Sequence, residues 1–128
     1  MELTGSCHCH RVRYRARPNA LKLIECNCSI CTKRGALHLR LAPEQVDFEG
    51  TEHLSLYQFG TLTAGHFFCS NCGIPVYSNP RVAPSQISLN ARTLDDFHQI
   101  EWERVAFDGQ HWEAAAAQLK SPPTPKEP

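Results

Sequence analysis

Seven cysteines, grouped in three clusters, constrain this chain more than any other feature. The clusters are Cys7/Cys9, Cys26/Cys28/Cys31 and Cys69/Cys72. In a reducing cytosol such clusters are typical of metal ligands or catalytic thiols rather than of disulfides. The odd count prevents complete pairing, and a disulfide across a single residue would be strained. The cysteines therefore predict metal binding.

Length and composition exclude several other classes of protein. A chain of 128 residues indicates one domain with one modest core. The formal net charge is zero, which argues against a nucleic-acid partner. No stretch approaches the roughly 20 apolar residues of a membrane span, and the start lacks the basic and apolar segments of a signal peptide. We expect a soluble, cytoplasmic protein that does not bind membranes.

Residues 11–17 alternate strictly between arginine and other side chains, which predicts a strand. Val12, Tyr14 and Ala16 are expected to face the core. The opposite face would carry Arg11, Arg13, Arg15 and Arg17. Such a basic row could attract an anionic substrate or phosphates, or it could be a solvated outer face that discourages aggregation.

The rest of the chain predicts further short strands and one helix. Strands are expected at residues 21–25, 36–41, 54–59, 65–68, 74–78, 86–90 and 101–107. Residues 112–120 contain four successive alanines and have high helix propensity. The proline-rich residues 121–128 cannot continue a helix and are expected to form a disordered tail. The folded domain is therefore predicted to span residues 1–120.

The trio Cys26/Cys28/Cys31 is predicted to lie where a strand turns into a helix. Cys26 and Cys28 can point the same way from extended backbone, and the spacing of Cys28 and Cys31 suits the first turn of a helix. Lys33 and Arg34 follow closely. They could offset thiolate charge or hold a substrate carboxylate, or they could be solvated surface.

The other two clusters also lie at predicted turns. Gly5 is expected to allow a tight turn before Cys7/Cys9, and Gly73 is expected to adopt a positive φ after Cys69/Cys72. A redox function for Cys69/Cys72 would require a helix start in a βαβ unit, and no such unit is visible. The nearby His8 and His10 are interpreted as exposed or as donors to sulfur. His66 is interpreted as a packed or surface residue.

Seven sulfurs divide naturally into four and three. A four-sulfur zinc site is closed and structural, whereas a site with three protein ligands leaves a position for substrate. The two remote pairs could form the first site and the local trio the second. An alternative in which Cys28 and Cys31 complete the four-sulfur site remains open. All-sulfur ligation favours zinc, with iron as the alternative.

The chain resembles the glutathione-dependent formaldehyde-activating enzymes, a family that includes centromere protein V. The resemblance runs from Gly5 to about Lys120 and rests on residues 5–9, 26–31, 66–73, 79–81, 89–95 and 107–113. The family usually has glycine at the position of His10 and often has cysteine at the position of Thr93. Neither difference removes a cysteine that matches the family's ligands.

The resemblance implies a mainly β, Mss4-like fold of short antiparallel strands with a short C-terminal helix. It implies two zinc ions, one structural at Cys7, Cys9, Cys69 and Cys72 and one catalytic at Cys26, Cys28 and Cys31. The implied activity is that of a carbon–sulfur lyase of the S-(hydroxymethyl)glutathione synthase type, with glutathione and formaldehyde as substrates. The alternatives are a non-enzymatic zinc module that binds a protein or nucleic acid, and a purely structural domain with two closed sites.

Overall fold

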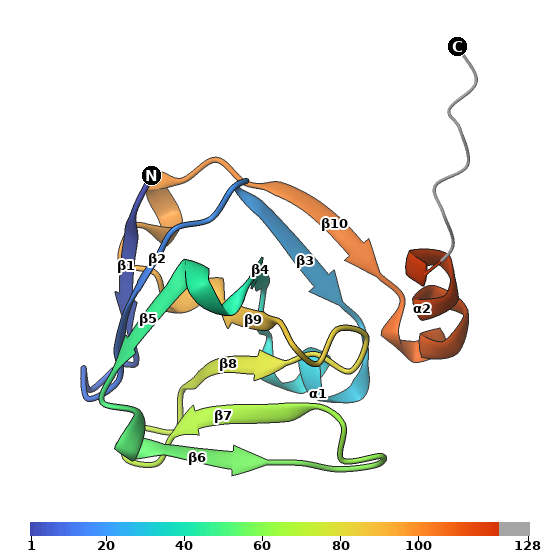
Figure 1. Cartoon of the computed structure of the whole chain (residues 1–128), viewed down its shortest axis with the longest axis horizontal. Helices are drawn as coiled ribbons and strands as arrows, with labels where there is room; N and C mark the ends of the chain where they lie inside the picture. The colour runs from blue at the N-terminus through green and yellow to red at the C-terminus, as the bar shows by residue number, and fades with distance from the viewer. Residues whose placement is uncertain (121–128) are drawn as a thin grey trace.

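The computed structural model describes residues 1–120, which form two β-sheets and two α-helices (Figure 1). The strands are β1 (Leu3–Ser6), β2 (Arg13–Ala16), β3 (Lys22–Cys26), β4 (His38–Leu41), β5 (Val46–Glu49), β6 (Leu54–Tyr57), β7 (Gly65–Cys69), β8 (Pro75–Asn79), β9 (Ile87–Asn90) and β10 (Glu103–Phe107). The α-helices are α1 (Ser29–Arg34) and α2 (Trp112–Lys120). The tail predicted at 121–128 lies outside the described residues.

The larger sheet has seven strands in the order β10-β3-β4-β9-β8-β7-β6, and the smaller has three in the order β1-β2-β5. The expected mainly β fold with a short C-terminal helix is confirmed. One strand pair differs from the expected antiparallel pattern, because β10 runs parallel to β3. Most of the sheet lies between these two strands in the sequence, so the chain has room for the crossover that a parallel pair requires.

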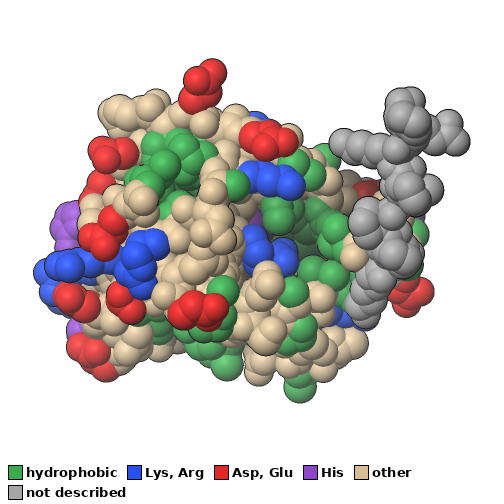
Figure 2. Space-filling view, turned by 45° about the horizontal axis from the view of Figure 1, so that its top comes forward, with side chains coloured by type: hydrophobic (Ala, Val, Ile, Leu, Met, Phe, Trp, Pro, Cys, Tyr) green, Lys and Arg blue, Asp and Glu red, His purple; other side chains and the backbone are tan. Residues whose placement is uncertain are grey.

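The alternating pattern of residues 11–17 has the predicted effect. Val12, Tyr14 and Ala16 are buried. On the opposite face Arg13 pairs with Glu49 at 3.2 Å and Arg17 pairs with Asp47 at 3.0 Å. Figure 2 shows acidic and basic side chains interspersed on the left side of the molecule, where the smaller sheet lies. Two of the four arginines are thus neutralised by β5.

The prediction that Gly5 forms a tight turn is wrong. Gly5 lies within β1, and a Cβ atom there would come within 2.6 Å of the Thr93 carbonyl oxygen and would also meet the Tyr14 phenol. The turn comes after the strand, at residues 7–10, where His10 has a φ of 66° and its N–H donates to the Cys7 carbonyl. A left-handed conformation favours glycine, so His10 occupies a backbone conformation that is uncommon for a histidine.

A buried hydrogen bond joins the smaller sheet to the larger one. The Tyr14 hydroxyl lies 2.7 Å from Thr93 Oγ1, which donates to the Asn90 carbonyl at 2.7 Å. Thr93 Oγ1 has one proton, so the Tyr14 hydroxyl is the donor in the first bond. Burial raises the pKa of Tyr14, so this donor keeps its proton.

No helix among residues 1–120 has both the length and the apolar character that crossing a bilayer demands.

The Tyr14–Thr93 link predicts an asymmetry between two substitutions. Thr93→Val leaves the buried Tyr14 hydroxyl without its partner and should lower the free energy of unfolding by about 1–3 kcal/mol. Tyr14→Phe leaves no orphaned donor and should cost less. Urea unfolding at fixed metal concentration measures both, and Thr93→Val should cost less in the Tyr14→Phe background. Equal costs in the two backgrounds would contradict the assignment.

Candidate metal centre

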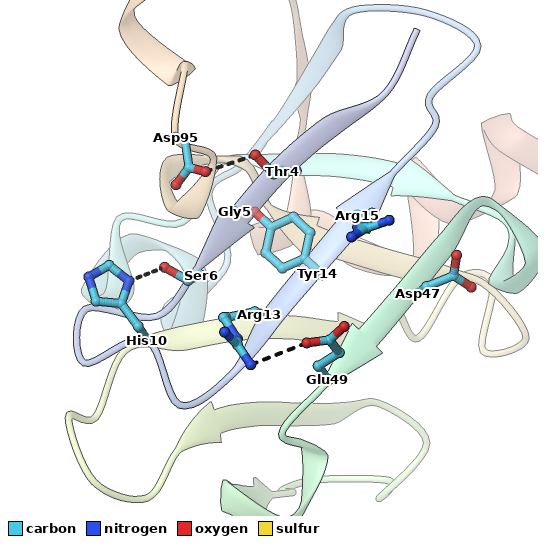
Figure 3. Close-up of a pocket in the computed structure, with 10 residues that line it drawn as sticks. All are labelled: Thr4, Gly5, Ser6, His10, Arg13, Tyr14, Arg15, Asp47, Glu49 and Asp95. Atoms are coloured by element: carbon cyan, nitrogen blue, oxygen red, sulfur yellow. Dashed lines mark hydrogen bonds and ion pairs between the residues drawn. The ribbon is translucent and has the colours of Figure 1, made fainter.

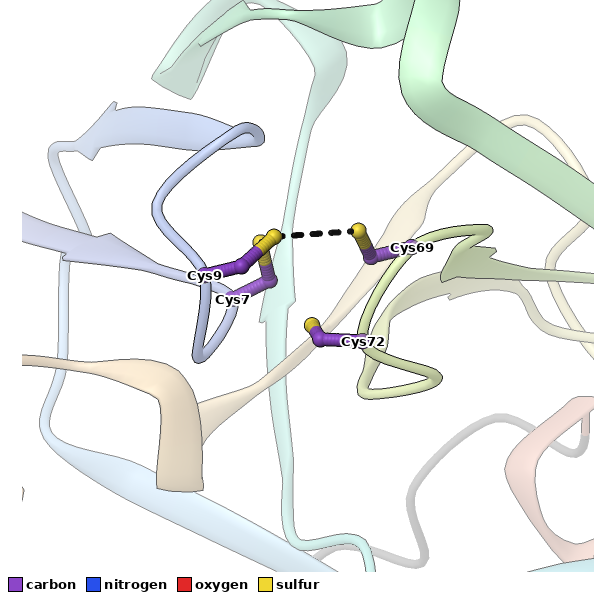
Figure 4. Close-up of side chains that lie close together, drawn as sticks. All are labelled: Cys7, Cys9, Cys69 and Cys72. Carbon is purple, nitrogen blue, oxygen red and sulfur yellow. Dashed lines mark hydrogen bonds between the residues drawn. The ribbon is translucent and has the colours of Figure 1, made fainter.

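Four cysteines from the two sheets meet in one group (Figure 4). Cys7 and Cys9 come from the turn between β1 and β2, and Cys69 and Cys72 come from the end of β7. The Cys9 sulfur lies 3.6 Å from the Cys7 sulfur and 3.6 Å from the Cys69 sulfur. All four sulfurs of the group lie within 4.8 Å of one another. Tetrahedral zinc with bonds of about 2.3 Å separates its sulfurs by about 3.8 Å. The group therefore fits a metal ion of this kind.

Backbone geometry shapes this four-cysteine group. Gly73 has the expected positive φ of 78°, and its N–H donates to the Cys69 carbonyl at 2.8 Å. The Val12 N–H points to the Cys7 sulfur at 3.4 Å. Burial raises the pKa of Cys7, whereas the backbone N–H of Arg11 lowers that of Cys9. The buried thiol therefore needs a compensating cation before it can ionise.

The remaining three cysteines form a second group, separate from the first. Cys26 ends β3, Cys28 is the N-cap of α1 and Cys31 lies in its first turn. Their sulfurs lie within 4.8 Å of one another. Helix α1 ends at Gly35, which has a φ of 65° and donates its N–H to the Cys31 carbonyl at 2.9 Å. Cys28 and Cys31 thus stay with Cys26 and do not join the four-cysteine group.

Crowding makes the three sulfurs of the trio unequal. Hydrogen bonds from the Cys26 and Cys31 thiols lower the pKa of Cys28 to about 2, and the same crowding raises the pKa of Cys31. One thiolate therefore forms readily, and the next is opposed by its charge. A divalent cation would remove this opposition, because metal binding releases the remaining protons.

The segment before α2 packs directly on the trio. A Cβ atom at Gly109 would lie 2.6 Å from the Cys26 sulfur and 2.7 Å from Cys28 Cβ. Asn27 holds this segment: its side-chain N–H donates to Asp108 at 2.9 Å, and its oxygen accepts the Gln110 N–H at 2.9 Å. The sequence did not predict this contact, because nothing in residues 108–110 indicates a partner about 80 residues away.

A small cavity adjoins the trio on the side of the larger sheet. It has a volume of about 20 Å³ and is lined by residues that include Cys31, Arg34, His38, His66 and Tyr77. The Nε2 atom of His38 lies 3.2 Å from the Cys31 sulfur. Burial lowers the pKa of His38 to about 4, so the imidazole is neutral at pH 7. The sequence analysis did not single out His38. The available signal was its polar side chain in the alternating strand predicted at residues 36–41.

Polar side chains cross the larger sheet beside this cavity. The register pairs Arg40 with Ser88, Ser88 with Ser78, and Ser78 with His66. His38 pairs with Asn90 next to this row. Ser78, Ser88 and Asn90 are all buried. We call these six residues the polar row.

A larger pocket of about 490 Å³ lies on the smaller sheet, away from the trio (Figure 3). Several of its polar side chains already pair with one another. Arg13 binds Glu49, the Thr4 hydroxyl donates to Asp95 at 2.8 Å, and Ser6 lies 2.8 Å from the His10 ring. No cysteine lines it. The trio and its small cavity are therefore the better candidate for chemistry.

The fold and the two cysteine groups define a small, mainly β protein built around two metal-type sites. Residues 2–112 match the family model described as glutathione-dependent formaldehyde-activating enzyme, and the chain belongs to this family. A curated relative from Halomonas elongata, named "Putative glutathione-dependent formaldehyde-activating enzyme", is 38% identical over 115 residues, covering 82% of this chain and 73% of its own. A crystal structure of a Rhodobacter sphaeroides protein matches with a TM-score of 0.70 and 31% identity, over 80% of this chain and all of that one.

The close approach of Gly109 predicts a selective defect. Gly109→Ala should press on Cys26 and Cys28 and lower the trio's metal affinity at least about tenfold, in line with the usual effect of disturbing groups around metal ligands. The four-cysteine group should keep its ion. Chelator competition with metal analysis measures the two affinities. Gln110→Ala introduces the same side chain one residue away and should leave both unchanged; equal losses in the two variants would contradict the assignment.

Proposed function

We propose that this protein is a zinc-dependent carbon–sulfur lyase of the S-(hydroxymethyl)glutathione synthase type. The observation that carries the proposal is the trio, a group of three sulfurs beside a cavity in a chain of this family. Three protein ligands leave a position for a substrate, whereas the four-cysteine group is complete by itself. Reduced cysteine ligands suit the cytoplasm, which is the location we propose.

Each cysteine group would hold one zinc ion. Cys7, Cys9, Cys69 and Cys72 would hold a structural ion, and Cys26, Cys28 and Cys31 a catalytic one. Thiolate donors and sulfur spacings of 3.6 Å suit zinc. When bound by the trio, zinc would lower the pKa of a substrate thiol and hold its sulfur in place.

The reaction joins glutathione and formaldehyde without a redox step. The sulfur of the ionised thiol adds to the carbonyl carbon, and the electron pair of the C=O bond moves to oxygen. That oxygen takes up one proton, which balances the one lost by the thiol. The reverse reaction breaks the same carbon–sulfur bond. The chain's part is to bring the two reactants together, which is a large share of many rate enhancements.

Two features of the trio's surroundings suit these substrates. The cavity of about 20 Å³ next to Cys31 has room for a molecule about the size of water, and formaldehyde is the smallest carbonyl compound. Arg34 lines the same cavity. Its guanidinium can bind a carboxylate of glutathione through two parallel hydrogen bonds.

The proposal is tested by the rate at which glutathione and formaldehyde exchange with their adduct. Exchange NMR should show that the zinc-loaded protein accelerates this exchange at least about tenfold above the uncatalysed rate. Cys28→Ser is the control: it should retain one zinc per chain and lose the acceleration. A wild-type protein that neither binds thiols nor accelerates exchange would contradict the proposal and favour the non-enzymatic zinc module.

The proposed role of Arg34 gives a second prediction. Arg34→Gln should raise the KM for glutathione about tenfold, the effect of losing one charge-assisted contact, and should leave the KM for 2-mercaptoethanol unchanged, because that thiol has no carboxylate. Steady-state exchange rates with the two thiols measure this difference. Arg13→Gln, on the smaller sheet, is the matched control. An equal change for both thiols would contradict a carboxylate contact.

A further inference from the structure

Exposed apolar side chains gather on one hairpin of the larger sheet, formed by β6, β7 and their connection (Figure 1). Six large hydrophobic side chains are exposed among residues 1–120, and four of them lie between residues 56 and 62. These four are Leu56, Tyr57, Phe59 and Leu62. A cluster of this kind on the surface of a small protein indicates a binding surface, whereas scattered single residues do not.

Three rings of this hairpin contact one another. The Phe59 ring centroid lies 5.6 Å from that of His66, with 16° between the ring planes, and 5.7 Å from that of Tyr57, with 26°. The centroids of Tyr57 and His66 are 6.5 Å apart. Tyr57 is 48% exposed and Phe59 is 44% exposed. We call the rings of Tyr57, Phe59 and His66 the aromatic platform.

Strand register places the aromatic platform on the face of the sheet that carries the polar row. Tyr57 lies directly opposite His66, and His66 lies directly opposite Ser78. Residues opposite each other in an antiparallel pair point to the same face. Phe59 follows Tyr57 by two residues and is in the same phase, in agreement with its ring contact to His66. The polar row therefore continues across the edge strand β6 as a row of rings.

His66 connects the aromatic platform to the trio. It lines the cavity of about 20 Å³ that Cys31 also lines, and one water molecule alone needs roughly 10–15 Å³. A carbon atom that is bonded to a sulfur at the trio and occupies this cavity therefore lies next to the His66 ring. A planar substituent on that carbon can extend over His66 onto Phe59.

The tip of the hairpin holds Phe59 in place. The Leu62 N–H donates to the Phe59 carbonyl at 3.1 Å, and the Gln58 side-chain N–H donates to the Leu62 carbonyl at 3.0 Å. Leu62 has a φ of 59°, an uncommon conformation for leucine that persists where surrounding contacts fix the backbone. A platform on a fixed backbone loses little conformational entropy when it binds a ligand.

The charges near the aromatic platform select the kind of planar group that suits it. Arg34 lines the same cavity as His66, and among the described residues no carboxylate lines this cavity. Arg40 belongs to the polar row on the same face. A cationic ligand, which aromatic rings also attract, would be repelled by these guanidinium groups. The platform therefore suits a neutral aromatic ring, which binds other rings by stacking.

We propose that the aromatic platform is a specificity site for aromatic aldehydes, so that the protein acts on aryl aldehydes as well as on formaldehyde. The thiolate sulfur adds to the carbonyl carbon, the C=O electron pair moves to oxygen, and that oxygen takes up the proton lost by the thiol. The product carries its ring on the carbon next to sulfur, and this ring stacks on Phe59 and Tyr57. The reaction rests on the proposed function, whereas the binding of the ring does not require turnover.

Two inert thioethers test the platform without turnover. S-methylglutathione and S-benzylglutathione correspond to the formaldehyde and benzaldehyde adducts of glutathione without their hydroxyl group. Calorimetry on the zinc-loaded protein should show that the S-benzyl compound binds about tenfold more tightly, the effect of one stacked ring and its buried area. Equal affinities, or no measurable binding of the S-benzyl compound, would overturn the proposal.

Substitutions at Phe59 separate stacking from general apolar contact. Phe59→Ser should bring the ratio of the two affinities close to one. Phe59→Leu keeps an apolar side chain without a ring and should give an intermediate ratio. Leu119→Ser removes another exposed apolar side chain, from α2, and is the control for which the wild-type ratio is expected. A wild-type ratio in either Phe59 variant would show that the ring does not stack there.

Two further measurements identify what occupies the platform. Intermolecular NOEs should connect protons of the benzyl ring with ring protons of Tyr57 and Phe59. Analytical ultracentrifugation tests whether the hairpin instead joins two copies of the chain. A dimer that Phe59→Ser converts to a monomer, together with an absence of NOEs from the benzyl ring, would assign the platform to a second copy and overturn the proposal.

Exchange kinetics separate this proposal from the proposed function. Acceleration of exchange with benzaldehyde that is lost in Phe59→Ser would support both. If neither aldehyde exchanges, the proposed function fails, and the affinity ratio of the two thioethers still decides whether the platform binds an aromatic ring. If formaldehyde exchanges and S-benzylglutathione binds no better than S-methylglutathione, the aromatic specificity alone fails.

Discussion

Repulsion between crowded thiolates is the constraint on which the structure depends. In each cysteine group the sulfurs lie within 4.8 Å of one another, and several thiolates at this distance repel strongly when partly buried. Protons relieve the repulsion only by making the sulfurs unequal, as in the opposite pKa shifts of Cys28 and Cys31. A divalent cation relieves it while keeping every sulfur ionised. Metal binding and folding are therefore expected to be coupled.

The two cysteine groups impose this constraint on different parts of the fold. Cys7 and Cys9 follow the smaller sheet, whereas Cys69 and Cys72 belong to the larger one, so the four-cysteine group joins sheets whose cysteines are 60 residues apart. The trio comes from one strand-to-helix turn, and its three cysteines do not link the two sheets. A local site of this kind can leave a position for substrate without loosening the domain, and this supports the proposal that the chemistry takes place at the trio.

Local pattern and spacing predicted much of this arrangement. The burial of Val12, Tyr14 and Ala16 follows from simple alternation, and the positive φ of Gly73 follows from its place after a Cys-x-x-Cys turn. Spacing also suggested the division into four and three. These features depend on residues that are neighbours in the sequence, and the physical rules that govern them act over a few residues.

Contacts between distant segments were beyond prediction from one sequence. Gly109 packs on Cys26, and β10 lies parallel to β3, because the chain returns to the trio after crossing the whole sheet. Gly5 illustrates the same limit. Glycine is required there because the Tyr14 phenol and the Thr93 carbonyl leave no room for a Cβ atom, and not because the chain turns at this residue. His38 reaches Cys31 only because β4 lies beside β3. In each case tertiary packing supplies the reason for the residue.

The buried polar side chains of the polar row lower the stability of the fold. Arg40, Ser88, Ser78 and His66 are direct neighbours across adjacent strands, in places where a sheet this buried would ordinarily carry apolar side chains. Burying polar groups costs free energy unless each finds a partner, and His38 Nδ1 and Arg40 Nε have none among the described residues. Both belong to the polar row, whose members His38, His66, Ser78, Ser88 and Asn90 line the cavity beside Cys31. Of the two residues with unpartnered atoms, His38 lines the cavity and Arg40 does not, so the polar row extends from the cavity into the neighbouring part of the sheet. The polar row and the trio meet where the His38 ring contacts the Cys31 sulfur.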